Sequence, residues 1–160
     1  MLSGRFRDLR FYCYRIGRLF SNRGDGVPDP HPAGLTLSEY FEPHGPPPED
    51  IRENALHLLA KVNALLNEIP LPEAESPSIN SGWRPAYYNR TVSNAAPNSH
   101  HITGRAVDVR DDDGMIDDYL FDNQDLLTRH GLFMEHPAAT KRWCHLQDVP
   151  PRSQKRVFFP

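Results

Sequence analysis

Cysteine and long apolar runs are both scarce in this sequence. The chain of 160 residues has two cysteines, Cys13 and Cys144, so a fold held together by several disulfides is excluded. No apolar run is long enough to cross a bilayer, and arginines interrupt the N-terminal apolar stretch. We therefore expect neither a membrane span nor a secretory signal peptide. The net charge of −3 gives no indication of nucleic-acid binding.

Charged and aromatic side chains are unevenly distributed along the chain. Residues 1–34 contain six arginines and three acids, a balance of +3, which leaves −6 on residues 35–160. Aromatic residues alternate with arginines in this first segment, which ends in glycines and prolines. We predict a basic aromatic N-terminal arm over 1–34, either a docking segment or a loosely ordered extension, and one folded domain over 35–160.

The first part of the domain has the pattern of helices. Thr36 and Glu39 have the spacing of a capping box, which predicts a short helix directly after them. Over 50–69 the apolar residues recur with the helical period, which predicts a longer helix with one buried face. Another helix is expected over 116–130, with Gly131 as its C-terminal stop.

The later part of the domain consists mostly of short segments that are typical of β-strands. Strands are expected over 79–83, 107–110 and 143–147, and the segment 132–135 is expected to be extended. Helices come first and most strands follow later. This order favours an α+β fold over a doubly wound parallel sheet.

Two histidines and one aspartate have an order and spacing suited to a metal ion. His101 and Asp108 belong to the segment S-H-H-I-T-G-R-A-V-D, and His145 follows later in W-C-H. Side chains alternate between the faces of a strand, so Asp108 and His145 can meet if their strands are neighbours. Gly104 allows a sharp turn, through which His101 can close the site from a loop. Cys144 would then lie on the opposite, buried face.

Two imidazoles and one carboxylate are a ligand set that suits zinc. Three protein ligands leave a fourth position for water, which is the arrangement of a catalytic zinc site rather than a closed structural one. We therefore predict one zinc ion bound by His101, Asp108 and His145, in a hydrolase.

These motifs resemble those of a known group of enzymes. The pattern S-x-H-x-x-G-x-A-x-D, followed by W-x-H, is similar to that of the zinc D-Ala-D-Ala carboxypeptidase and L-alanyl-D-glutamate endopeptidase family. This family includes bacteriophage endolysins and shares its fold with the hedgehog signalling domain. The upstream S-G-W-R-P also resembles the family's S-G-[YW]-R segment. The resemblance covers residues 81–147. It implies a hedgehog/DD-peptidase fold, in which a small antiparallel sheet carries the zinc site and helices pack on one side.

A metallopeptidase also needs a general base. In many relatives a glutamate lies a few residues before the last histidine, but here the nearest one upstream is Glu135, ten residues before His145. Glu135 can reach the site if residues 137–142 form a loop between paired strands. We predict that Glu135 is the catalytic base, with His136 as the alternative.

The resemblance implies roles for further residues around the metal. It places Arg84 beside the scissile bond as a catalytic residue, where the guanidinium could bind a peptide carboxylate or the developing oxyanion. Ser99 is expected to bind the substrate or to orient a ligand. Trp143 either walls the cleft or belongs to the core.

The resemblance thus implies a zinc-dependent metallopeptidase that cleaves the stem peptides of peptidoglycan. Both carboxypeptidase and endopeptidase activity fit these ligands. The protein would be a phage- or prophage-encoded cell-wall hydrolase, located in the virion or tail, or in the host cytoplasm before release to the cell wall. The alternative is a structural virion or tail component that keeps the fold and the metal, docked through residues 1–34 on another virion or tail protein.

Overall fold

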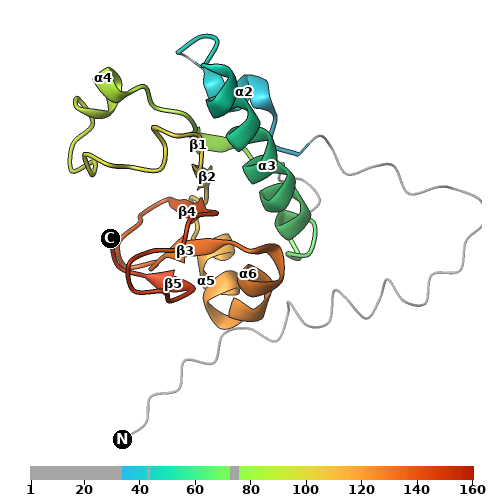
Figure 1. Ribbon diagram of the computed structural model, residues 1–160. Coiled ribbons are helices and arrows are strands. Elements are labelled where there is room, and N and C mark those ends of the chain that lie inside the picture. The colour runs from blue at the N-terminus through green and yellow to red at the C-terminus, as the bar shows by residue number, and fades with distance from the viewer. Residues whose placement is uncertain (1–33, 43, 73–75) are drawn as a thin grey trace, which may run out of the picture. The chain divides into compact units, whose positions relative to one another are not determined.

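A computed structural model describes residues 34–42, 44–72 and 76–160 of the chain. Apart from Gly34, the predicted N-terminal arm lies outside the described residues, and so do the predictions made for it. The described residues form five helices, α2 to α6, and one five-stranded sheet (Figure 1). They confirm the prediction of an α+β fold.

Helices α2 (Leu37–Phe41) and α3 (Glu49–Leu66) agree with the sequence patterns. The predicted capping box is formed: Thr36 Oγ1 accepts a hydrogen bond from the backbone N–H of Glu39, and the Glu39 carboxylate accepts one from that of Thr36. Helix α3 ends three residues earlier than expected, because the backbone N–H groups of Glu68 and Ile69 donate to carbonyls three residues earlier, in the tighter pattern of a final turn. None of the described helices combines the length and the apolar character needed to span a membrane.

The segment 116–130 forms two helices, so the prediction of a single helix there was wrong. Helices α5 (Met115–Asp122) and α6 (Gln124–His130) are separated at Asn123, whose backbone is not helical, with φ −125° and ψ 54°. The Asn123 side chain donates a hydrogen bond of 2.8 Å to the carbonyl of Tyr119. An asparagine side chain that bonds to the backbone in this way competes with helix continuation.

The strands lie in the order β1-β2-β4-β3-β5 across the sheet. They are β1 (Ile79–Ser81), β2 (Ala106–Arg110), β3 (Phe133–Glu135), β4 (Trp143–Gln147) and β5 (Val157–Phe158). The first three neighbouring pairs are antiparallel, but β5 pairs with β3 in parallel. The sheet is therefore mixed, and the expectation of a purely antiparallel sheet was wrong. With two residues, β5 is too short to show an alternating pattern in the sequence.

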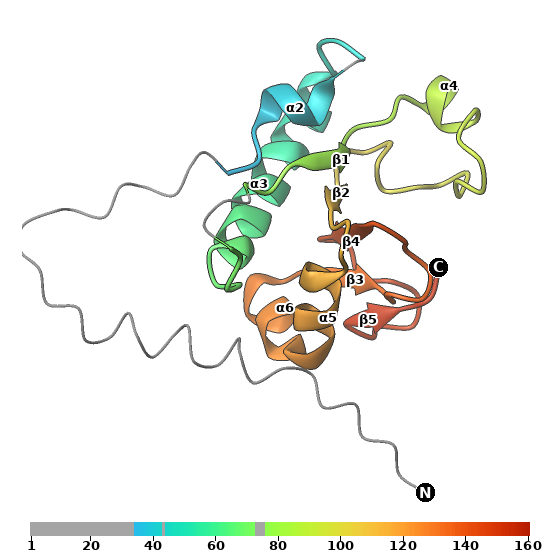
Figure 2. The same ribbon diagram turned by 180° about the vertical axis from the view of Figure 1, so that it is seen from behind.

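One face of the sheet is apolar and covered by helices. Its buried side chains are Val107, Val109, Met134, Cys144 and Leu146. They belong to one core cluster with buried residues of α2, α3, α5 and α6, and α3 and α6 lie side by side in this layer (Figure 2). Cys144 is fully buried here, as predicted.

The opposite face of the sheet carries polar side chains from three neighbouring strands. Because side chains alternate along a strand, Asp108, His145 and Glu135 share this face. Helix α4 (Ala86–Asn89), which was not expected, lies in the long loop between β1 and β2 and projects away from the sheet (Figure 1).

Candidate metal centre

Strands β2 and β4 place Asp108 directly opposite His145, as the strand pattern predicted. Nδ1 of His145 lies 2.7 Å from Oδ1 of Asp108, and both residues are 7% exposed. A shift of register by one residue would turn one of these side chains into the apolar core, so burial of the other face holds the two together.

His101 reaches the same space from the loop that precedes β2. Gly104 makes the turn with φ +72°, and a Cβ at this position would lie 2.7 Å from the carbonyl oxygen of Ile51. His101 is fully buried, and its Nε2 lies 3.3 Å from Oδ1 of Asp108. One potential ligand atom from each of His101, Asp108 and His145 lies within 4.8 Å of the other two.

The tautomer of His101 follows from its hydrogen bond to the backbone. Nδ1 lies 2.7 Å from the carbonyl oxygen of Gly82, and a carbonyl oxygen only accepts, so Nδ1 carries the proton. In the neutral ring, Nε2 then keeps its lone pair. This Nε2 is buried and has no hydrogen-bond partner among the described residues. A buried, unpartnered lone pair beside a carboxylate fits a bound cation.

The orientation of the His145 ring follows from Gln147, a residue that the sequence motifs do not indicate. The Gln147 amide nitrogen donates to the carbonyl of Val149 at 2.6 Å, which turns Oε1 toward His145. This Oε1 lies 3.3 Å from Nε2 of His145 and accepts its proton. Nδ1 faces the Asp108 carboxylate, which also only accepts, so Nδ1 carries a proton as well until a cation replaces it. Both histidines are therefore held with one nitrogen directed into the same space. The alternation of β4, which places Gln147 on the face of His145, was the available signal.

The three groups shift one another's pKa values. Burial alone would raise the pKa of Asp108, but the two histidines overcome this effect and hold it well below its usual range. Burial lowers the pKa of His101. Burial would also lower the pKa of His145, but its hydrogen bond to Asp108 and the charge of that carboxylate raise it. The centre thus contains an ionised carboxylate between a neutral imidazole and one that binds a proton readily.

Among the described residues, His101, Asp108 and His145 form a buried group that could hold a metal ion. Two imidazole nitrogens and a carboxylate oxygen are a ligand set used by catalytic metal sites. No protein-family model, curated protein or solved structure matches this chain. A function therefore has to be inferred from the chemistry of this centre and from the sequence motifs.

Glu135 lies next to the centre on the neighbouring strand. Its Oε1 is 4.0 Å from Nε2 of His145, and its side chain is 21% exposed. Residues 136–142 connect β3 to β4, which is the loop between paired strands that its reach required. The alternative base, His136, stacks on Phe159 with ring centroids 4.3 Å apart and accepts a hydrogen bond from Ala138.

Arg84 and Glu135 approach Asp108 from opposite sides. Arg84 follows β1 on one side of β2, whereas Glu135 belongs to β3 on the other side. Nη2 of Arg84 is 3.9 Å from Oδ2 of Asp108, and its side chain is 13% exposed. Its backbone N–H donates to the carbonyl of His101 at 3.2 Å, which ties the segment after β1 to the loop of the metal centre. The Nε atom is buried and has no hydrogen-bond partner among the described residues. The Nε–H group of Arg84 is therefore a hydrogen-bond donor that no described residue uses, beside the metal centre.

Ser99 and Trp143 lie near the centre in different ways. Oγ of Ser99 accepts a weak hydrogen bond of 3.4 Å from the backbone N–H of His101, a contact that orients the loop of a ligand residue. Trp143 is the first residue of β4, pairs with Arg110 and is partly buried on the face of His145. It does not belong to the buried core cluster of the described residues.

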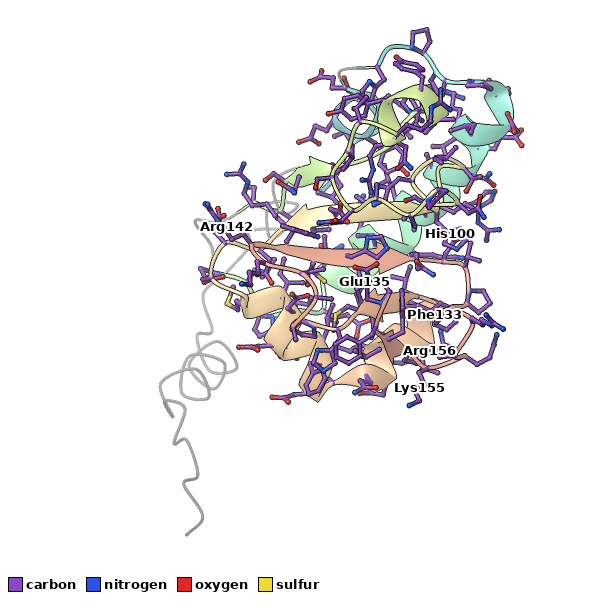
Figure 3. The ribbon with its side chains drawn as sticks, turned by 90° about the vertical axis from the view of Figure 1, so that its left-hand side faces the viewer. His100, Phe133, Glu135, Arg142, Lys155 and Arg156 are labelled. Carbon is purple, nitrogen blue, oxygen red and sulfur yellow. The ribbon has the colours of Figure 1, made fainter. Side chains whose placement is uncertain are left out.

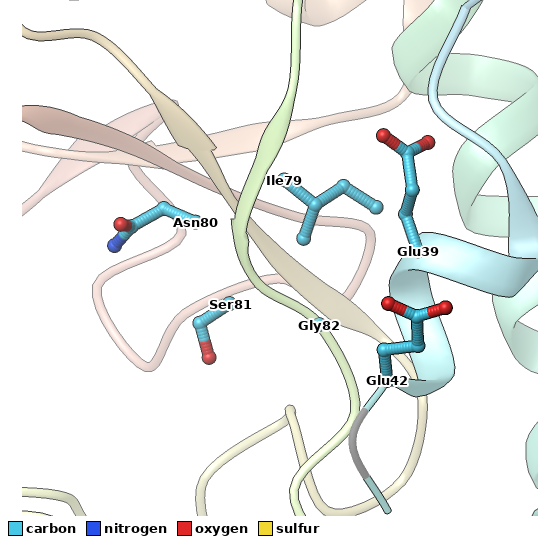
Figure 4. Close-up of a pocket in the computed structure, with 6 residues that line it drawn as sticks. All are labelled: Glu39, Glu42, Ile79, Asn80, Ser81 and Gly82. Carbon is cyan, nitrogen blue, oxygen red and sulfur yellow. The ribbon is translucent and has the colours of Figure 1, made fainter. Parts of the chain in front are cut away.

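A separate hollow of about 330 Å³ lies between α2 and β1 (Figure 4). Glu39 of α2 and Glu42, the C-cap residue that follows this helix, line it on one side, while Asn80 and Ser81 line it from β1 (Figure 4). None of the predicted ligands or catalytic residues borders it. The hollow is therefore distinct from the metal centre.

Proposed function

We propose that this protein is a zinc-dependent peptidase that cleaves the stem peptides of peptidoglycan, with a fold of the hedgehog/DD-peptidase type. The observation that carries this proposal is the buried group of His101, Asp108 and His145, in which one nitrogen of each histidine is directed at the carboxylate. The sequence motifs of the peptidase family supply the substrate class. As a cell-wall hydrolase with these motifs, it would be encoded by a phage or prophage.

His101 and His145 are held ready to bind a cation. The carbonyl of Gly82 and the amide oxygen of Gln147 each accept the proton of the nitrogen that is not directed at Asp108. When bound, zinc supplies Lewis acidity, which activates water for hydrolysis near neutral pH and polarises a peptide carbonyl.

Glu135 is the residue that would move protons. It is ionisable, partly exposed and on the same face as the ligands, one strand away from His145. A carboxylate in this position can take a proton from the attacking water and pass it to the leaving amine. Glu135 is thus the catalytic base of the proposed reaction.

Arg84 is the residue that would stabilise negative charge. Its guanidinium is largely desolvated, and its buried Nε has no partner among the described residues. Hydrogen-bond donors in such a site stabilise developing charge more strongly than they would in water. We assign to Arg84 the binding of the scissile carbonyl or of an adjacent peptide carboxylate.

The test is digestion of purified peptidoglycan by the full chain, with mass spectrometry of the released peptides. We expect one zinc ion per chain and peptides whose new ends identify the cleaved bond. His101→Ala should abolish both, whereas His57→Ala, which changes an exposed histidine on α3, should affect neither. Full hydrolysis by a metal-free preparation would overturn the mechanism. Zinc at full occupancy without any release of peptide would favour the structural virion component instead.

A further inference from the structure

Arg156 lies over Phe133, a residue on the same face of the sheet as the proposed catalytic base Glu135. Phe133 and Glu135 alternate along β3 and point to the same face, and Phe133 pairs with Gln147 of β4. The Arg156 guanidinium lies over the Phe133 ring, with Cζ 4.3 Å from the ring centroid. Figure 3 shows Glu135, Phe133 and Arg156 following one another on this side of the molecule.

The Arg156 guanidinium is held in place but keeps most of its donors. Nη1 donates to the carbonyl of Leu132 at 3.0 Å, and the ring of Phe133 supports the guanidinium plane from one side. A guanidinium has five N–H donors in a rigid fork, so the remaining ones can still bind a planar anion. The contacts to Leu132 and Phe133 reduce the entropy lost when such an anion binds.

No carboxylate neutralises this guanidinium within the described part of the chain. The ion pairs of residues 34–42, 44–72 and 76–160 do not include Arg156, nor its neighbours Arg152 and Lys155. Lys155 is exposed and projects from the same region as Arg156 (Figure 3). Residues 35–160 carry a net charge of −6, so acidic side chains outnumber basic ones. Cations that nevertheless have no acidic partner here indicate a surface that can bind an anion.

The strand register sets the distance between Arg156 and the metal centre. His145 on β4 and Glu135 on β3 belong to neighbouring strands, and Glu135 pairs with Phe158 on β5. Two steps of about 4.8 Å across the sheet, and two residues of about 3.3 Å back along the chain from Phe158, give a separation of about 12 Å between the backbones of His145 and Arg156. An extended peptide bound at the centre would cover this distance with three or four residues.

We propose that Arg156 binds a carboxylate of the peptide substrate, three or four residues from the bond that is cut. This inference rests on the proposed peptidase function and adds a determinant of substrate choice that the family motifs do not contain. The guanidinium forms a charge-assisted, bidentate pair with the carboxylate through two N–H groups at its edge, while the Phe133 ring supports one face of its plane. A carboxamide at the same position would lose one charge and one of the two acceptors.

The test measures binding rather than cleavage. A synthetic stem peptide is compared with versions in which each free carboxylate in turn is replaced by a carboxamide. Calorimetry with the zinc-loaded full chain in a Glu135→Gln background, which prevents turnover, gives the dissociation constants. We expect one carboxamide version to bind about tenfold more weakly than the parent peptide. Arg156→Gln, which keeps a donor for Leu132, should bind these two peptides equally weakly.

Arg156→Lys and Lys155→Gln complete the design. Arg156→Lys should recover part of the preference for the carboxylate, and Lys155→Gln should keep it in full. A purely structural role of Arg156 would lower the thermal unfolding midpoint and weaken all peptides alike. That result, or a wild-type chain that does not distinguish the peptides, would overturn the assignment. Failure of the proposed function is recognised separately, because the wild-type chain would then release no peptide from peptidoglycan.

Discussion

Asp108 and His145 face each other across strands β2 and β4, with Oδ1 and Nδ1 2.7 Å apart. The same nitrogen that bonds to the carboxylate is the one directed at the proposed metal, because Gln147 accepts the proton of Nε2. A proton and a metal ion therefore compete for Nδ1 of His145. This competition makes metal binding depend on pH. Metal binding also depends on the groups that accept the proton of the second nitrogen of each histidine, and on the loop that presents His101.

Metal affinity should fall as the pH is lowered. Burial would lower the pKa of His145, but the Asp108 carboxylate raises it above the ordinary 6.5. Below this raised pKa each unit of pH should weaken zinc binding about tenfold, since one proton must leave for each ion that binds. Competition with a chelator between about pH 5.5 and 8.5 measures the effect. An affinity that is constant across this range would contradict the prediction.

Replacing Gln147 by methionine should weaken zinc binding by about 10- to 100-fold. The substitution keeps the size of the side chain but removes the oxygen that accepts the proton of His145 Nε2. The neutral ring can then adopt the other tautomer, with the proton on Nδ1. Zinc titration gives the affinity, and NMR of the ring nitrogens in the metal-free chain gives the tautomer. Gln124→Met, on the exposed start of α6, is the control and should change neither.

Gly104→Ala should destabilise the protein and reduce metal affinity. The substitution places a residue with a side chain at φ +72°, with its Cβ 2.7 Å from the carbonyl of Ile51. Gly114→Ala is a matched control, because φ is +77° there but no atom lies within 4 Å of the added Cβ. The control should lose about 1 kcal/mol of unfolding free energy from backbone strain alone. Urea denaturation should show a larger loss for Gly104→Ala, and equal losses would refute the steric argument.

Asp117→Asn should stabilise the protein at neutral pH and have little effect in acid. Burial raises the pKa of Asp117 from 3.8 to about 6, despite hydrogen bonds from Cys144 and Thr140 that act in the opposite direction. The folded state thus holds this proton more tightly than the unfolded state, so wild-type stability falls as the pH rises from 3.8 to about 6. Above that pH, the variant should gain about 1–2 kcal/mol.

The measurement for Asp117→Asn is the free energy of unfolding at about pH 4 and about pH 8. The gain should be present at the higher pH and nearly absent at the lower one. Asp122→Asn, on the exposed end of α5, provides the control and should show no such dependence. A gain of the same size at both pH values would show that the charge of Asp117 is not its cause.

Several elements were predictable because their causes are local in the chain. The period of α3, the capping box of Thr36 and the alternation of β4 each depend on residues within a few positions of one another. The break at Asn123 was missed because a single asparagine bonding to the backbone outweighs the apolar period around it. The parallel strand β5 was missed because it exists only through its pairing with β3, more than twenty residues earlier in the chain.

The candidate ligands were recognisable from residue type and spacing alone. His101, Asp108 and His145 could be selected because an alternating strand and one glycine turn suffice to bring such side chains to one face. Which nitrogen of each histidine ring is directed at the metal could not be predicted in this way. It depends on the Gly82 carbonyl, 19 residues from His101, and on the amide orientation of Gln147.

The surroundings of the centre were likewise settled only by folding. The family motifs selected Glu135 as the glutamate nearest before His145, whereas nothing in the sequence distinguishes Arg156 from the other arginines. Strand pairing places the first 4.0 Å from His145 and the second over Phe133 on the same side of the sheet. The physical reason is that ligand chemistry belongs to individual residues, whereas hydrogen-bond direction, desolvation and the distance between charges arise from long-range packing.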